Sequence, residues 1–285
     1  MEHTVQLADG RSLEVHEAGD PDGFPVVFHH GTPGAGVLYG RWETSGVRLL
    51  GYDRAGYGGS TRKPGRAVVD VVDDVESLAD ALGIVRYATW GLSGGGPHAL
   101  ACAALGRRAV AAASVAGVGP YDGEGLDWLA GMGEGNREEF DLVLAGEDAL
   151  RPGVERERAA FLGTTAEELR ETMAPHLSPT DREALTGDLA AYVTESAHHG
   201  LAPGPDGWID DNLAFVRPWG FDLAAIERPV LIVQGGDDLM VPRGHGEWLA
   251  ANVAGCESRI DDAHGHLTLV EHLVPEITEW LLSHG

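Results

Sequence analysis

The chain has 285 residues, of which 43% are hydrophobic, enough for one large domain or a domain with an insertion. Acidic residues outnumber basic ones by 45 to 20, and the formal charge of −25 argues against nucleic acid or an anionic membrane as a partner. No apolar run approaches the ~20 residues of a membrane helix, the N-terminus lacks a signal-peptide pattern, and the two distant cysteines favour a reducing, cytoplasmic location.

The first half of the chain alternates predicted strands with loops and helices. Asp9-Gly10 is a strong hairpin signal between the first two strands. Continuous apolar runs such as 25–30 are typical of parallel strands buried on both faces. This rhythm predicts an α/β fold with a mostly parallel sheet. The strands are predicted at 4–7, 12–17, 25–30, 47–52, 84–90 and 110–115, and the helices at 68–82 and 98–105.

The pattern changes after residue 120. Up to about residue 221 it contains no convincing strand, and the α/β rhythm then resumes to the end of the chain. We therefore expect a core domain formed by 1–119 and 222–285 and an inserted helical cap at 120–221; alternatively, these helices belong to the main layer. Within this block, helices are predicted at 126–150, 154–162, 166–173, 179–198 and 207–216; after it, strands at 229–234 and 257–260 and helices at 244–252 and 268–282.

One serine lies in a glycine-rich turn between a predicted strand and a predicted helix. The residues are Gly91-Leu92-Ser93-Gly94-Gly95, a Gly-x-Ser-x-Gly pattern in strand–turn–helix context. A serine on such a tight turn has a strained backbone, and its hydroxyl is exposed at a helix N-terminus, where developing negative charge is favoured. The pattern indicates a nucleophile, although a plain βα turn or a phosphate-binding loop has similar residues.

A serine nucleophile needs a base, a group that orients the base and donors for the oxyanion. An acidic pair, Asp237-Asp238, and two histidines, His264 and His266, each follow a later predicted strand. Because the carboxyl ends of parallel strands meet in one crevice, these groups are expected to converge there with Ser93.

The chain order Ser, Asp, His and four matched stretches resemble the α/β-hydrolase superfamily over nearly the whole length. The resemblance implies an α/β-hydrolase fold, with a mostly parallel eight-stranded sheet flanked by helices and an inserted helical cap. The His-Gly-x-Pro-Gly form is also similar to the prolyl aminopeptidase and small-ester branch. The stretches are 30–34, 53–60, 91–95 and 235–242, with Gly-His at 265–266.

The resemblance implies a role for each matched residue. Ser93 is expected to be the nucleophile. His266 is expected to act as general base and then general acid, because in this family the base follows a glycine directly, as His266 does and His264 does not. His264 remains an alternative candidate for the general base; otherwise it is a histidine at the rim of the site or one that orients other groups.

The family spacing Gly-x-x-Asp-x-x-Val-Pro, counted from Gly235, selects Asp238 rather than Asp237 as the acid of the triad. Asp122 is a second-tier alternative, because some relatives place the acid after the strand that follows the serine; a turn or cap role is the preferred interpretation of this residue.

The oxyanion hole needs two backbone N–H groups. Gly94, directly after the serine, supplies one; Thr32 is expected to supply the other, because Pro33 has no N–H. His30 in the same loop either contacts substrate or holds the loop by a hydrogen bond. Asp53 and Arg54 are expected to brace the following loop as a charge pair.

The sequence of the cap indicates few residues for substrate binding. Trp128 and Trp219 are candidates for substrate binding, although aromatic residues that pack helices together have the same pattern. No His-Glu-x-x-His, Cys-x-x-Cys or phosphate-binding motif is present, so neither a metal nor a nucleotide cofactor is predicted. The other apolar cap residues considered are Met132, Phe140, Phe161, Trp208 and Phe215.

The leading functional hypothesis is a serine hydrolase that cleaves a carboxylic ester, lactone or amide of a small molecule. A prolyl-type aminopeptidase is the first alternative, and it would need cap carboxylates to hold a free amine. A non-hydrolytic cyclase or lyase is the second, because fold does not fix function. The sequence leaves the substrate and the oligomeric state open. The cap acids considered are Glu134, Glu138, Glu139 and Glu195.

Overall fold

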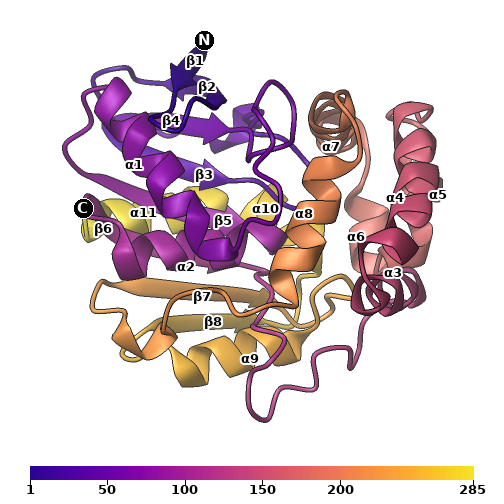
Figure 1. Cartoon of the computed structure of the whole chain (residues 1–285). Coiled ribbons are helices and arrows are strands. Elements are labelled where there is room, and N and C mark those ends of the chain that lie inside the picture. The colour runs from indigo at the N-terminus through magenta and orange to yellow at the C-terminus, as the bar shows by residue number, and fades with distance from the viewer.

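The computed structural model describes residues 1–285, and an eight-stranded sheet runs through its centre (Figure 1). The strand order is β1-β2-β4-β3-β5-β6-β7-β8; β2 is antiparallel to both of its neighbours, and all other pairs are parallel. The predicted mostly parallel sheet is confirmed. The strands are β1 Glu2–Gln6, β2 Ser12–Gly19, β3 Phe24–His29, β4 Val47–Tyr52, β5 Tyr87–Leu92, β6 Ala109–Val115, β7 Val230–Gly235 and β8 Glu257–Asp261.

Each face of the sheet carries its own hydrophobic core, because successive side chains of a strand point to opposite faces. Val27 of β3 faces α1, α2 and α9, whereas its neighbour Val26 faces α10 and α11. Figure 1 shows α1, α2 and α9 on one side of the strands and α11 on the other. These helices are α1 Val71–Ala81, α2 Gly96–Leu105, α9 Arg243–Asn252, α10 His266–His272 and α11 Val274–Ser283.

The segment between β6 and β7 is helical, as predicted, but more divided. The expected helix over 126–150 begins only at Glu134 and breaks at Gly146, whose φ of 101° a residue with a side chain rarely adopts. Its helices are α3 Glu134–Ala145, α4 Glu147–Leu162, α5 Leu169–Thr172, α6 Pro179–Ala184, α7 Gly187–Leu201 and α8 Asp206–Phe215; the 3₁₀ turns of the chain are η1 Gly40–Trp42, η2 Val68–Asp70, η3 Ser93–Gly95, η4 Ala174–His176 and η5 Leu223–Ala225.

The inserted helices lie beyond the carboxyl ends of the parallel strands (Figure 1). Helix α8 stands between the sheet and the helices α3, α4 and α5, and its Gly207 packs directly on Gly56 and Tyr57 of the core. The division into a core and a cap at residues 120–221 stays a prediction. None of the helices combines the length and the apolar character that a bilayer crossing requires.

A buried carboxylate, Asp211, fastens α8 to the core. Its oxygens lie 2.6 Å from Arg54 Nη2 and 2.6 Å from Arg66 Nη1. The hydroxyls of Thr32 and Tyr57 donate to it at 2.6 and 2.9 Å. Burial alone would raise the pKa of Asp211, but the two guanidinium groups hold this pKa well below its usual range. The loops after β3 and β4 are therefore joined to α8 through one charge.

This arrangement corrects the expected pair of Asp53 with Arg54. Arg54 pairs with Asp211 and also donates to the carbonyl oxygens of His30 and Gly31. Asp53 instead accepts from the backbone of Gly36 and lies against histidine side chains. The two residues point to opposite sides of the chain, so adjacency in sequence does not make them partners.

We expect Asp211→Asn to lower the free energy of unfolding by about 3–5 kcal/mol, because it leaves two buried guanidinium groups without a counter-charge. Asp206→Asn is the matched control: this carboxylate on the same helix is 38% exposed to solvent and pairs with Arg62, so the loss is about 1 kcal/mol or less. Urea unfolding of both variants measures the difference. An equal loss in both would contradict the role assigned to Asp211.

Candidate functional site

Ser93 occupies the turn between β5 and α2. Its φ is +55°, a left-handed conformation that costs a residue with a side chain of order 1–3 kcal/mol. Tight packing makes the turn possible: a Cβ at Gly91 would collide with the Gly95 carbonyl, and a Cβ at Gly95 with the His29 carbonyl. The strained serine turn predicted from the glycine pattern is present.

The loop after β3 lies beside this turn. A Cβ built at Gly31 would lie 3.5 Å from Ser93 Cβ, and one built at Gly94 would collide with the Thr32 side chain. The Thr32 hydroxyl is engaged by Arg54 and Asp211, whereas its backbone N–H donates to no backbone acceptor. Thr32 and Gly94, the two expected donor residues, are thus in contact next to the serine.

His266 opens α10 and is paired with Asp238. The distance from its Nδ1 to Asp238 Oδ2 is 2.7 Å, and both residues are buried. Asp238 is fixed by the N–H groups of Met240 and Val241, each 2.8 Å from Oδ1. Burial would lower the pKa of His266, but Asp238, with a smaller contribution from Asp181, raises it above the usual value. Asp238 therefore stabilises the imidazolium form of His266 relative to an unpaired histidine.

The sequence did not predict Asp181, whose carboxylate binds the backbone at the start of the helix that carries His266. This α6 residue accepts from the backbone N–H groups of His266, Leu267 and Thr268 at 2.7, 2.8 and 3.0 Å. It therefore caps the N-terminus of α10 from 85 residues away. The motif Ser178-Pro179-Thr180-Asp181 predicts the start of a helix. Nothing in it indicates that Asp181 also binds the N-terminus of α10.

The rival residues lie elsewhere. The Asp237 carboxylate accepts from Thr180 Oγ1 at 2.7 Å and does not contact His266. His264 Nε2 lies 3.8 Å from the Asp261 carboxylate, and His264 is not part of the cavity that contains the serine. Asp122 lines a different hollow on the surface. Geometry thus favours Asp238 and His266 over all three alternatives.

One cavity brings the site together. Ser93, His266, His30 and Thr32 form its floor with neighbouring core residues, and side chains of the inserted segment form the opposite wall. The wall is mainly apolar, with a polar end near α3 and α4. The residues contributed by the inserted segment are Asn136, Glu139, Glu157, Phe161, Met173, His176, Tyr192, Val193, Ser196, Ala197 and Trp208.

The structure corrects two of the three expected substrate contacts. Trp128 is buried, donates to the Gly119 carbonyl at 2.7 Å and packs on Phe140, away from the cavity. Trp219 lines the separate hollow with Asp122. Both are large apolar side chains that find packing partners between elements.

His30 does line the cavity, but both of its nitrogens are occupied. The distance from Nδ1 to the Gly31 carbonyl oxygen is 2.7 Å, and Nε2 accepts from the Arg54 N–H at 3.0 Å. Burial lowers the pKa of His30 well below its usual value, so the ring is neutral. His30 therefore holds the loop in shape, the second of the two roles expected for it.

Two carboxylates form the polar end of the cavity. Glu139 is one of the four cap acids selected from sequence; Glu157 was not among them. Burial, with the charge of Glu157, raises the pKa of Glu139 to about 7, and burial also raises the pKa of Glu157. Asn212 donates to Glu139 at 2.6 Å. This end of the cavity therefore favours a cation, or a proton in its absence.

Similar sequences include several proline iminopeptidases. That of Arabidopsis thaliana is 33% identical over 103 residues, which cover 34% of this chain and 27% of that protein. That of Neisseria gonorrhoeae is 32% identical over 105 residues, covering 35% and 34%. The chain thus spans about a third of the length of these relatives. A non-heme chloroperoxidase of Streptomyces lividans is 27% identical over 256 residues, covering 84% of this chain and 83% of that protein.

Solved structures with the same fold cover the whole chain. An alpha/beta hydrolase fold protein from Nakamurella multipartita has a TM-score of 0.67 at 28% identity, with 100% of both chains covered. A thermophilic esterase from Thermogutta terrifontis has a TM-score of 0.70 at 21% identity, also with 100% of both covered. The enol-lactonase from Burkholderia xenovorans has 0.68 at 20%, covering 99% of this chain and 100% of that one. The family model for the alpha/beta hydrolase fold matches residues 25–273, and the chain belongs to this family.

Proposed function

We propose that this protein is a serine hydrolase that cleaves a carboxylic ester, lactone or amide of a small molecule through an acyl-enzyme. The observation that carries the proposal is the convergence on one cavity of Ser93, on its strained turn, and His266, hydrogen-bonded to Asp238. Esterases and an enol-lactonase among the structures of similar fold are consistent with it.

In the proposed reaction Ser93 Oγ attacks the acyl carbon while His266 Nε2 takes its proton. Asp238 accepts from His266 Nδ1 and stabilises the imidazolium. The N–H groups of Thr32 and Gly94 stabilise the oxyanion of the tetrahedral intermediate. The imidazolium then protonates the leaving alkoxide or amine. Water, deprotonated by the same imidazole, attacks the acyl-enzyme, and the acid and the free Ser93 hydroxyl are released.

We expect Ser93→Ala to reduce the hydrolysis of short p-nitrophenyl esters by on the order of 10⁴–10⁶-fold, because the nucleophile is lost. The same variant should lose covalent labelling by a fluorophosphonate. Ser196→Ala is the matched control, since Ser196 is the other serine that lines the cavity; it should keep the label. Retained labelling of Ser93→Ala would exclude the proposed nucleophile.

A second candidate is an aminopeptidase that requires a free N-terminal amine. The carboxylates of Glu139 and Glu157 at the polar end of the cavity favour it, since they suit an ammonium group, as do the partial matches to proline iminopeptidases. In this reaction the ammonium lies between the two carboxylates while the amide carbonyl faces Ser93.

A proline arylamide and its N-acetylated form separate the two candidates. Amine recognition predicts that kcat/KM for the free arylamide is higher by at least about 10-fold, because one charged contact contributes about 1.5–3 kcal/mol. It also predicts that Glu139→Gln reduces this preference. Equal rates for the two compounds would exclude the aminopeptidase and leave the esterase proposal in place.

The raised pKa of Glu139 predicts a pH-dependent stability. An unfolded glutamate has a pKa of about 4.3, whereas the pKa in the fold is about 7. The folded state therefore binds the extra proton more tightly, and its contribution to stability is full below pH ~4.3 and lost as the pH rises through ~7.

Glu139→Gln removes this loss. We expect the variant to be more stable than the wild type by on the order of 2 kcal/mol at pH 8 and no more stable at pH 4.5. Thermal unfolding at the two pH values measures the difference. Glu138→Gln on the exposed side of α3 serves as the control and should show no such difference. A Glu139→Gln effect of equal size at both pH values would contradict the buried, raised-pKa assignment.

A further inference from the structure

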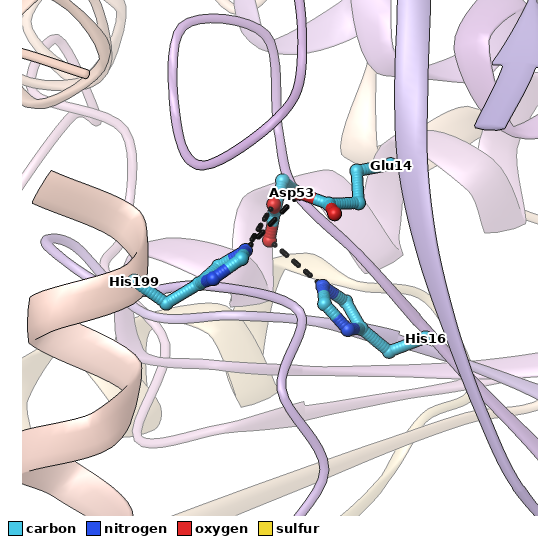
Figure 2. Close-up of side chains that lie close together, drawn as sticks. All are labelled: Glu14, His16, Asp53 and His199. Carbon is cyan, nitrogen blue, oxygen red and sulfur yellow. Dashed lines mark hydrogen bonds and ion pairs between the residues drawn. The ribbon is translucent and has the colours of Figure 1, made fainter. Parts of the chain in front are cut away.

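A cluster of four side chains outside the cavity brings together imidazole and carboxylate groups. Glu14 and His16 belong to β2, Asp53 follows β4, and His199 lies in the last turn of α7. One nitrogen or oxygen of each lies within 4.8 Å of all the others. Figure 2 shows both imidazole rings turned toward the Asp53 carboxylate, with Glu14 beside it. Three segments far apart in sequence thus converge on one point.

The spacing of these atoms fits a small cation. His199 Nε2 lies 2.9 Å from Asp53 Oδ2 and 3.2 Å from Glu14 Oε2, and His16 Nε2 lies 3.4 Å from Asp53 Oδ1. In a tetrahedral zinc site with bonds of about 2.1 Å, neighbouring ligand atoms lie about 3.4 Å apart. All pairs of the four ligand atoms lie within 4.8 Å, so side-chain shifts of about 1 Å would complete the coordination.

His16 supplies an independent indication. The residue is only 8% exposed, and its buried Nε2 faces Asp53 Oδ1 at 3.4 Å without forming a hydrogen bond. Buried polar atoms in folded proteins are nearly always paired, and an unpaired one is unfavourable. A metal ion between His16 and the carboxylates would accept the free lone pair of this nitrogen.

The carboxylates are already held in place by the backbone. The Gly36 N–H donates to Asp53 Oδ1 at 2.8 Å, and the Gly59 N–H donates to Asp53 Oδ2 at 3.1 Å and to Glu14 Oε2 at 2.7 Å. Such outer contacts orient ligands and limit their movement before a metal arrives. With both imidazoles neutral the four side chains carry two negative charges, which a divalent cation would neutralise.

We propose that Glu14, His16, Asp53 and His199 form a four-coordinate site for one Zn²⁺ ion. Two imidazoles suit zinc better than calcium or magnesium, which prefer all-oxygen sites. In the metal-free protein His199 Nε2 instead contacts the Asp53 and Glu14 carboxylates directly. With both imidazoles neutral, a bound Zn²⁺ ion leaves an electrically neutral site.

The proposed ion would fasten α7 to the sheet. Helix α7 also carries Tyr192, Val193, Ser196 and Ala197 of the cavity wall. A bond to His199, three residues after Ser196, therefore limits the movement of this wall relative to β2 and the Asp53 loop. The role is structural, and it does not depend on the proposed hydrolysis.

The test is a calorimetric titration of ZnCl₂ into the metal-stripped full chain, without added histidines, at pH 8. We expect about one Zn²⁺ per chain, a micromolar or tighter dissociation constant and a rise in Tm, because the ion binds only the folded state. MgCl₂ should produce neither effect. Absence of Zn²⁺ binding, or equal binding of Mg²⁺, would overturn the proposal and leave the cluster as an imidazolium salt bridge.

Variants locate the binding. His16→Ala should weaken Zn²⁺ binding by on the order of 100-fold, and Glu14→Gln, at the more exposed side of the cluster, by at least about 10-fold. The control is His272→Ala, because His264 and His272 form a second pair of imidazoles 5.7 Å apart where zinc would bind adventitiously. Unchanged affinity in folded Glu14→Gln, or loss of binding in His272→Ala, would overturn the assignment. Neither measurement uses turnover.

Discussion

The carboxylate of Asp211 is the interaction on which the site depends. Burying a charge costs several kcal/mol, and the cost is offset here by two guanidinium groups and two hydroxyl donors. One of those hydroxyls belongs to Thr32, in the loop beside Ser93. The loop therefore takes its position only when α8, more than 170 residues later, has packed on the sheet. The core and the inserted helices are energetically one unit at this point.

The same dependence explains how strain at Ser93 is tolerated. A positive φ at this residue is unfavourable, and the turn persists because its surroundings leave no room for another path. The carbonyl of His29 lies against Gly95, and the Thr32 side chain lies against Gly94. Arg54 in turn holds the carbonyl groups of His30 and Gly31. The loop that Asp211 fixes is thus the loop against which the serine turn is packed.

Local sequence patterns predicted most of the fold. Apolar runs predicted the central strands such as β3 and β7, because a strand buried on both faces needs continuous hydrophobic residues. The hairpin signal Asp9-Gly10 indicated the first two strands. Glycine spacing predicted the serine turn, because the backbone there leaves no space for Cβ atoms. The partners that side chains find across the fold could not be predicted from such local patterns. Asp181 beneath His266 and Asp211 beside Arg54 are ordinary acidic residues in their own segments. Trp128 and Trp219 were misplaced for the same reason, since an aromatic side chain suits a helix contact as well as a cavity.

Helix α7 shows how such distant partners become part of a site. One end of its inward face forms cavity wall at Tyr192 and Ser196, and its last turn carries His199 into the cluster with Asp53. Gly200, which follows His199, packs so closely on the Gly34 carbonyl that a side chain would collide. Gly34 itself lines the cavity. The cluster and the cavity wall therefore share one helix, which packs directly on the loop that lines the cavity.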